Sequence, residues 1–292
     1  MRYGLLILAL IGPALGGCTE GVLDPKGPIA SAERLILFNS LGIMLAIVIP
    51  TILATLGVAF WFRESNRRAS YLPDFEYSGR LELLVWSIPA MTVLLVGGVA
   101  WVGAHDLDPR KAIDSTVKPV TVQVVSLDWK WLFIYPEQGI ASVNHLTVPV
   151  GTPISLELTS STVMNSFFVP QLAGQIYTMS GMVTRLQLQA DHTGTYSGLS
   201  AMFSGEGFAD MRFTVDAVPN EDFSQWVTHA QNAGPVLDAK TYADLAQPST
   251  AVAPSSYREV TPDLFGGVVN AEMVTDDSSP RICSTSSQRA EQ

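Results

Sequence analysis

The chain has 292 residues, enough for one membrane region and one soluble domain of ordinary size. Hydrophobic residues make up 47% of the sequence and charged residues 15%, and the mean hydropathy is +0.25. The 27 acidic and 17 basic residues give a formal net charge of −10, which argues against nucleic-acid binding and against a polybasic hold on anionic lipid. The two cysteines, Cys18 and Cys283, lie near opposite ends, so the sequence offers no disulfide framework or internal cysteine cluster.

The N-terminus has the pattern of an export signal. Arg2 precedes an apolar stretch over residues 5–15, and small residues follow it, so residues 1–17 are predicted to be a signal peptide. The tetrapeptide Leu-Gly-Gly-Cys that ends at Cys18 resembles the bacterial lipobox, in which the cysteine is diacylated and becomes the first mature residue. Cys18 is therefore the predicted lipid-attachment site. A plain secretory signal with an incidental cysteine is the alternative.

Two long runs without a formal charge follow, 28 residues over 35–62 and 22 residues over 83–104. A helix rises about 1.5 Å per residue and needs ~20 residues to cross the hydrocarbon layer. The sequence therefore predicts transmembrane helices at 35–62 and 82–104, with residues 18–34 as a short periplasmic segment before them. Two buried core helices are the alternative. A proline inside each run suggests packing against further membrane helices.

The loop between the two runs, residues 63–81, has four arginines against three acidic residues. Lys and Arg mark the cytoplasmic side of a membrane, whereas acidic residues count little. The loop is therefore predicted to be cytoplasmic, and everything after residue 104 periplasmic. The lipobox independently places the N-terminus outside. The predicted location is the bacterial inner membrane, with a lipid-anchored N-terminus and a large periplasmic domain.

After Pro119 the pattern changes to short alternating runs, which predict an antiparallel sandwich or barrel within residues 105–219. Strands are expected at 120–125, 145–150, 154–158, 167–170, 183–188, 194–199 and 211–215. One further aromatic run is expected to form a strand with four side chains on one face: Trp129, Trp131, Phe133 and Tyr135.

Residues 220–273 are predicted to form a C-terminal helical extension. Asn220 is expected to cap its first helix, and a second short helix is expected at 239–245. The final segment, residues 274–292, is predicted to be disordered, and Cys283 within it is interpreted as an unpaired surface thiol.

A helical hairpin followed by a β-domain resembles subunit II of the haem-copper respiratory oxidases. Glu82-x-x-x-Trp86-x-x-Pro89 resembles the start of that family's second membrane helix, and the run from Asp128 to Pro136 resembles its aromatic-rich strand. The resemblance extends from the lipobox to about Met273. It implies two transmembrane α-helices followed by an all-β, cupredoxin-like sandwich, with short C-terminal helices and a disordered tail.

Cytochrome c oxidase members of that family bind a dinuclear copper centre in this domain. Their ligands lie in an early His-Ser-aromatic-x-x-Pro element and a later C-x-E-x-C-x-x-x-H-x-x-M element. The corresponding positions here are Asn165 for the first His, Ser200 and Ser204 for the two Cys, Met202 for the Glu, Phe208 for the second His, and Met211, which is retained.

A bridged copper pair needs thiolates between the metals and imidazole at each copper. A serine hydroxyl is un-ionised at neutral pH and a weak ligand, and a phenyl ring cannot coordinate. The domain also has no cysteine for a mononuclear blue-copper site, so no cofactor is expected in this chain. All four histidines fall outside the ligand positions: His105, His145, His192 and His229. A thioether Cu(I) site is the alternative, although methionine is more often core filler; its candidates are Met164, Met179, Met182, Met202 and Met211.

A retained scaffold with emptied copper positions matches the quinol oxidase branch of the family, of which the bo-type ubiquinol oxidase is the best-known form. The resemblance implies a non-redox subunit of a complex that oxidises ubiquinol, reduces dioxygen to water and translocates protons. Haem, copper and ubiquinol would lie in the partner subunit I. The implied partners are subunit I, the smaller membrane subunits and the bilayer, and not cytochrome c. A stand-alone membrane-anchored lipoprotein is the alternative, and the serines nearly exclude a copper-bearing subunit.

Single residues also carry expectations from the resemblance. The glutamate that matches Glu82 is associated in the family with the mouth of a proton-uptake channel; the alternative is an interfacial carboxylate favoured by the helix dipole. Trp129 and Trp131 stand where copper-bearing relatives receive electrons, and here packing is the preferred interpretation. Asn165 is expected to keep a structural hydrogen bond.

Overall fold

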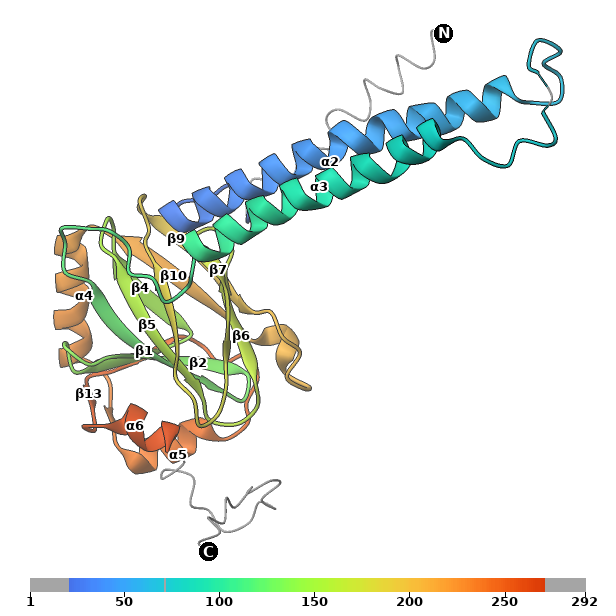
Figure 1. Cartoon of the computed structure of the whole chain (residues 1–292). Helices are drawn as coiled ribbons and strands as arrows, with labels where there is room; N and C mark the ends of the chain where they lie inside the picture. The colour runs from blue at the N-terminus through green and yellow to red at the C-terminus, as the bar shows by residue number, and fades with distance from the viewer. Residues whose placement is uncertain (1–20, 71, 271–292) are drawn as a thin grey trace, which may run out of the picture.

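The computed structural model of the chain describes residues 21–70 and 72–270 (Figure 1). Two long helices precede a β-sandwich that carries shorter helices on its outside. The predicted signal peptide, the predicted lipid-attachment site Cys18, and the C-terminal segment with Cys283 lie outside the described residues.

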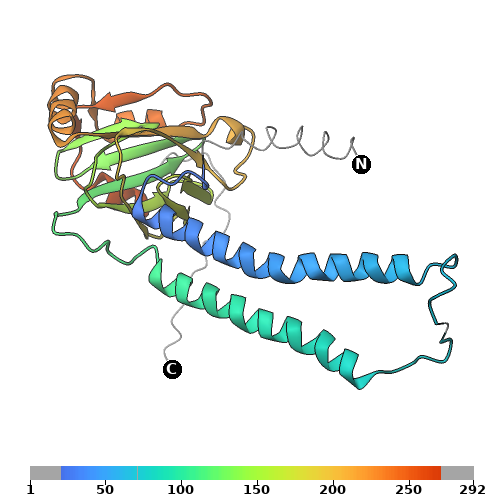
Figure 2. The ribbon, with the colours of Figure 1, turned by 90° about the horizontal axis from the view of Figure 1, so that it is seen from above.

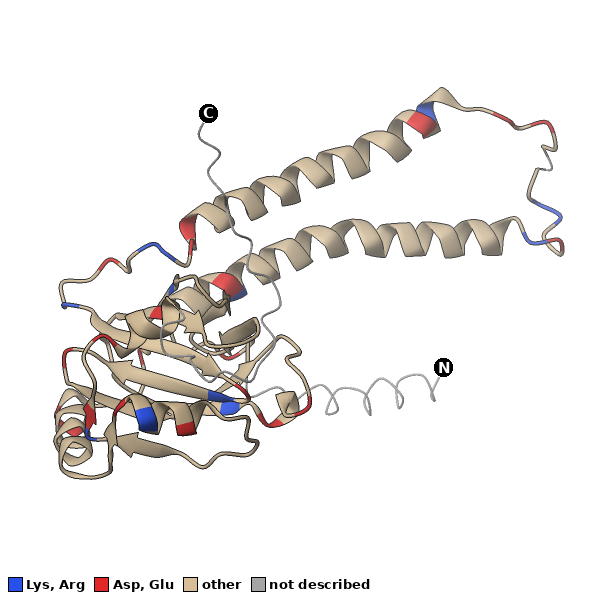
Figure 3. Ribbon diagram, turned by 90° about the horizontal axis from the view of Figure 1, so that it is seen from below, with Lys and Arg blue, Asp and Glu red and all other residues tan. Residues whose placement is uncertain are grey.

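The two predicted membrane segments are helices, α2 (Pro28–Trp61) and α3 (Gly79–Asp106). Both are long and apolar enough to cross a membrane, and their most apolar windows are not buried against the rest of the described chain. The alternative of two buried core helices is therefore wrong. Figure 3 shows the charged residues gathered near the ends of the hairpin. These helices anchor the protein in the membrane.

Both helices extend beyond the predicted spans. α2 begins seven residues before residue 35, and α3 continues two residues past 104. Pro28 occupies the first turn of α2, where the missing N–H of proline costs nothing. The two helices touch near the sandwich, where a Cβ on Gly103 would lie 2.6 Å from Cδ1 of Ile36. Away from the sandwich they diverge (Figures 2 and 3).

The sandwich consists of a six-stranded sheet in the order β12-β3-β2-β1-β5-β8 and a five-stranded sheet in the order β4-β10-β9-β6-β7. The strands that precede the C-terminal extension are β1 (Val120–Leu127), β2 (Lys130–Tyr135), β3 (Ile140–Val143), β4 (His145–Pro149), β5 (Ile154–Ser160), β6 (Asn165–Val169), β7 (Ala173–Thr178), β8 (Thr184–Leu188), β9 (Gly194–Ser200) and β10 (Arg212–Val218).

The sequence pattern predicts an antiparallel sandwich, whereas the observed sandwich also contains parallel strand pairs. β1 pairs with β5, and β4 with β10, in parallel. Periodic alternation reports which way side chains point and not the direction of the partner strand, so the sequence could not reveal this. Parallel partners need a crossover connection. The chain between β1 and β5 supplies one, because it passes through β4 in the other sheet.

Trp129 is not part of the aromatic strand, contrary to the prediction. It lies in the turn between β1 and β2 with φ of 66°, in the left-handed region that few non-glycine residues adopt. Trp131, Phe133 and Tyr135 follow on β2 and are fully buried in the core between the two sheets.

The C-terminal extension contains strands as well as helices: α4 (Asn220–Asn232), β11 (Val236–Leu237), α5 (Ala239–Ala246), β12 (Ser255–Tyr257), β13 (Glu259–Val260) and α6 (Leu264–Val269). The predicted capping role of Asn220 is wrong, because Asn220 is already the first helical residue and Pro219 occupies the N-cap position. Asp238 caps α5 instead, since its carboxylate accepts a hydrogen bond from the Thr241 N–H at 2.8 Å.

This extension covers the outer face of the six-stranded sheet. Leu132 and Ile134 of β2 point to that face and pack in a second core with side chains of α5 and α6. Every residue of β2 is consequently buried, on both faces. The extension is thus an integral layer of the domain, with β12 added at the sheet edge beside β3.

A short segment before α2 fixes the hairpin to the sandwich. The Lys26 N–H donates to the Gln171 carbonyl at 2.7 Å, and the Asp191 N–H donates to the Lys26 carbonyl at 2.8 Å. A Cβ on Gly27 would overlap the Gln189 carbonyl oxygen, so only glycine fits there. The hairpin therefore leaves the domain in a defined direction.

Candidate functional site

The six positions that match copper ligands in the family come together at one end of the sandwich. Asn165 begins β6, Ser200 ends β9, and Met211 immediately precedes β10. Because β6 and β9 are paired, the Ser200 hydroxyl reaches the Asn165 side chain and donates to its Oδ1 at 3.3 Å. The Ser200 N–H also donates to the Met211 carbonyl at 3.1 Å.

The loop 201–210 closes this end and brings in the remaining positions. The Ser204 hydroxyl lies 3.9 Å from the Met211 Sδ, and the Met202 carbonyl accepts a hydrogen bond from the Ser200 hydroxyl at 3.3 Å. Phe208 starts a single 3₁₀ turn, η2 (Phe208–Asp210), and its ring packs edge-on against Phe203 with centroids 5.6 Å apart. The phenyl ring thus pairs with a neighbour within the loop.

These side chains do not fit a bridged copper pair. Among them are one amide, two hydroxyls and two thioethers, and no thiolate or imidazole. Both hydroxyls donate hydrogen bonds within the cluster, and the Asn165 amide is held between Ser200 and the Val163 carbonyl, to which its Nδ2 donates at 3.2 Å. Throughout residues 21–70 and 72–270 no three His, Cys, Asp or Glu side chains assemble into a metal-binding group.

The aromatic strand forms the packed centre of the domain. The Trp131 ring lies 5.3 Å from Phe167 and 5.6 Å from Phe213, both in edge contacts. The Tyr135 hydroxyl donates to the Thr147 carbonyl at 2.9 Å and accepts from the Thr147 N–H at the same distance. Burial raises the pKa of Tyr135, so its hydroxyl stays neutral. These contacts are the packing role preferred from the sequence.

Trp129 contacts the emptied site directly. Its indole Nε1 donates to the Ser204 carbonyl at 3.0 Å. Two glycines of the loop make room for the ring, because a Cβ on Gly205 would lie 3.3 Å from it and a Cβ on Gly207 only 2.4 Å. Trp129 therefore holds the loop 201–210 in place. This contact joins two segments far apart in sequence, so no local pattern predicts it.

Lys130 is a buried lysine that links two segments of the domain, a role that the sequence pattern did not predict. It is 1% exposed, and its Nζ donates to the Gln247 carbonyl at 2.8 Å and to the Ser249 Oγ at 2.5 Å. Burial lowers the pKa of Lys130, and the nearby Asp128 carboxylate opposes this effect. The ammonium thus ties the C-terminal extension to the turn that carries Trp129. Thr250 of the same extension lies beside Gly207.

Comparison with known proteins places the chain in a family. Its residues 137–218 match the model of the "Cytochrome C oxidase subunit II, periplasmic domain", and residues 231–274 match the "COX Aromatic Rich Motif". It is 46% identical to the cytochrome bo(3) ubiquinol oxidase subunit 2 of Pseudomonas aeruginosa over 89% of this chain and 79% of that protein.

Two further relatives agree. Identity to the ubiquinol oxidase subunit 2 of Acetobacter aceti is 44%, over 96% of this chain and 92% of that protein. Identity to the quinol oxidase subunit 2 of Bacillus subtilis is 39%, over 84% of this chain and 78% of that protein. The chain belongs to the quinol oxidase subunit 2 family.

Membership confirms the resemblance stated from the sequence, including the cupredoxin-like sandwich after a helical hairpin. As a member of this family, the chain is part of an oxidoreductase complex that acts as a terminal oxidase. It associates with other oxidase subunits, and the sandwich is its periplasmic domain.

Glu82 lies far along the chain from the emptied site and is not brought to it. It stands in the first turn of α3, at the end of the hairpin away from the sandwich, and its side chain is exposed. The positive end of the helix dipole stabilises a carboxylate there. The position suits either proton uptake or a simple helix start.

The methionines considered for a Cu(I) site differ in their surroundings. Met211 is 1% exposed and belongs to the core between the sheets, whereas Met164 and Met182 are 39% and 52% exposed. Met211 thus has the filler role expected of methionine.

Proposed function

We propose that this chain is the copper-free subunit II of a ubiquinol oxidase of the bacterial inner membrane, and that no electron passes through it. Haem, copper and ubiquinol would all lie in subunit I, and the smaller membrane subunits and subunit I would be its partners. The single observation that carries the proposal is the set of side chains at the copper positions, where hydroxyl, amide and phenyl groups replace the thiolates and imidazoles that a bridged copper pair requires.

The donor's solubility explains why such a subunit works. Cytochrome c is a water-soluble donor and needs a periplasmic relay to reach a buried haem. Ubiquinol arrives through the lipid and donates directly to a membrane-embedded subunit. A relay in the periplasmic domain is then redundant, while the domain can still cover subunit I and support its assembly. The intact core and the Trp129 and Lys130 contacts support a role that needs a rigid scaffold.

We propose further that Cys18 carries a lipid. The lipobox is followed within three residues by the first described residue, Gly21, and the segment from there to α2 is held against the sandwich. A lipid on Cys18 would therefore enter the outer leaflet beside the outer end of the hairpin, on the periplasmic side that the arginines of the loop 63–81 imply.

Proton uptake at Glu82 is the third element of the proposal. The side chain is exposed near the cytoplasmic end of a membrane helix, where a carboxylate can take up protons from water. It would hand them to subunit I, because the described part of this chain offers no buried acidic path through the hairpin.

Purification in mild detergent through a tag on this chain tests the function. We expect haem absorbance and ubiquinol oxidase activity to co-elute with the chain in constant ratio. Elution of the folded chain without haem, from cells that contain the oxidase, would favour the stand-alone lipoprotein and contradict the proposal.

A further inference from the structure

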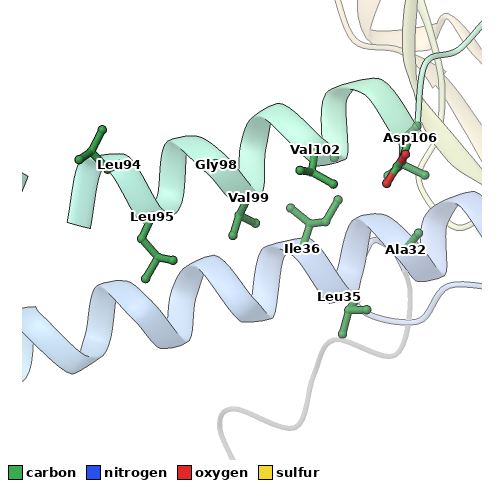
Figure 4. A pocket seen from close by; sticks show the side chains of 11 residues that line it. Ala32, Leu35, Ile36, Leu94, Leu95, Gly98, Val99, Val102 and Asp106 are labelled. Carbon is green, nitrogen blue, oxygen red and sulfur yellow. The ribbon is translucent and has the colours of Figure 1, made fainter. Parts of the chain in front are cut away.

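An apolar groove runs between α2 and α3 at the end of the hairpin next to the sandwich. Its hollow has a volume of about 610 Å³, within the ~300–1,000 Å³ range of ligand pockets. Ile36 of α2 and Leu95 and Val99 of α3 point into the space between the helices (Figure 4). Asp106 is the one charged residue among those that line it, and it lies at the outer mouth.

The shape of the groove follows from small residues. At Gly103 the two helices touch through Ile36, whereas a Cβ on Gly98 would meet nothing within 4 Å. The hollow therefore lies beside a close helix contact and narrows toward it.

The position of the chain's N-terminal side points to the occupant. The Leu23 carbonyl accepts a hydrogen bond from the Arg34 Nη1 at 3.3 Å. The next residue of α2, Leu35, lines the groove. Consecutive residues of a helix point about 100° apart and Arg34 does not line the groove, so this hydrogen bond holds the chain before α2 against another side of α2, at the end of the helix where the groove lies. Val22 and Leu23 are 38% and 45% exposed, as expected of apolar side chains that meet lipid.

The length of chain that remains is short. Cys18, the first residue after the predicted cleavage, precedes Gly21 by three residues, which span at most ~10 Å at 3.3–3.6 Å per residue. A lipid on Cys18 therefore begins within about 10 Å of Gly21, at the same end of the hairpin as the groove. We propose that the groove between α2 and α3 holds an acyl chain of the lipid attached to Cys18.

This inference rests on the lipid attachment proposed above and adds a binding site for it. Burial of the acyl chain would fill the hollow with apolar surface, at about 0.8 kcal/mol per buried CH₂ in general. The acyl chain would then pack between α2 and α3 and set the distance between them. It would also hold the N-terminus at the membrane.

Photo-crosslinking in the intact complex tests the site. Val99 is replaced by p-benzoylphenylalanine, and Leu95 by the same residue in a second variant in case the first does not assemble. Val93, which is exposed on α3 and does not line the groove, is the matched control. After irradiation and digestion, we expect the α3 peptide to be joined to the N-terminal lipopeptide at positions 99 and 95, and at least tenfold less at 93.

Two results would overturn the inference, and they are distinguishable. If positions 99 and 95 label free phospholipid or a partner subunit while the Cys18 lipopeptide is recovered intact, the groove has another occupant and the lipid anchor stands. If the N-terminal peptide carries no lipid, the anchor and the groove assignment both fail. Neither result would affect the copper-free role, which is measured by haem and activity in the same preparation.

Discussion

The indole Nε1 of Trp129 donates a hydrogen bond to the carbonyl oxygen of Ser204 at 3.0 Å. The two residues are 75 positions apart, one in the turn between β1 and β2 and the other in the loop 201–210. Lys130, next to Trp129, holds the C-terminal extension at Gln247 and Ser249. The loop, the turn and the extension are therefore one connected unit, held together by side-chain hydrogen bonds.

Trp129→Phe removes the hydrogen bond and part of the packing on the loop. We expect the free energy of unfolding to fall by about 1 kcal/mol, and amide hydrogen exchange over residues 200–211 to become faster. Quinol oxidase turnover should stay the same, because the proposed function routes no electron through the ring. Trp226→Phe, on α4, is the control and should leave exchange in the loop unchanged. A collapse of turnover with unchanged exchange would show that Trp129 has an electron-transfer role.

Lys130→Met leaves the Gln247 carbonyl and the Ser249 hydroxyl without their buried donor. We expect a loss of about 1–3 kcal/mol of stability and faster proteolysis of the extension after residue 246. Lys118→Met is the matched control, since the Lys118 side chain is 78% exposed and its ion pair with Glu137 contributes at most about 1 kcal/mol. Equal effects of the two variants in urea unfolding would contradict the role given to Lys130.

Tyr242→Phe tests the interface between the extension and the sheet. The Tyr242 hydroxyl is buried, and among the described residues none meets hydrogen-bond geometry with it. Burial raises its pKa to about 12. Unfolded tyrosine ionises near 10, so the stability that depends on the neutral hydroxyl is complete below pH 10 and is lost as pH rises toward 12. We expect Tyr242→Phe to leave the free energy of unfolding at pH 7 unchanged or to increase it. Between pH 10 and 12 the variant should lose less stability than the native chain, by up to about 1.4 kcal/mol per pH unit. Tyr177→Phe, at an exposed position, should leave the pH profile as it is.

Glu82→Gln removes the carboxylate proposed to take up protons. We expect ubiquinol oxidation by the complex to slow several-fold, with Glu82→Asp retaining most of the rate, and haem content unchanged. Glu76→Gln, in the loop that precedes α3, is the control. Full activity of Glu82→Gln across the pH range would leave Glu82 as a helix-start residue only.

The sequence predicted those parts of the fold that depend on local pattern. Uncharged runs gave both long helices, and alternation gave most strands of the sandwich. Strands β3 and β7 were not predicted. β3 has only four residues, all buried, so it shows no alternation, and β7 has few apolar residues. α6 was missed because Leu264–Val269 is a six-residue segment with two glycines in a polar surrounding. Its place in the domain depends on the outer face of β2, a tertiary contact that no local pattern encodes.

The candidate site was predicted from the family's copper-ligand motif. The contacts of Trp129 and Lys130, which connect its loop with the turn and the extension, are visible only in the structure. The resemblance to the family's copper motif implied that Asn165, Ser200 and Ser204 share one site, and the pairing of β6 with β9 brings the first two together. The role of Trp129 was hidden by its left-handed backbone, which takes it out of the strand register. Lys130 was hidden because a lysine in a strand is ordinarily exposed.

Copper binding is the most direct test of the central claim. The full chain, purified in detergent and incubated with Cu(II), is desalted and measured for bound copper and for near-infrared absorbance. We predict less than stoichiometric copper and no near-infrared band, because serine and phenylalanine replace the sulfur and imidazole that a copper pair requires. Two tightly bound copper atoms per chain, with a purple colour and a near-infrared band, would contradict the account.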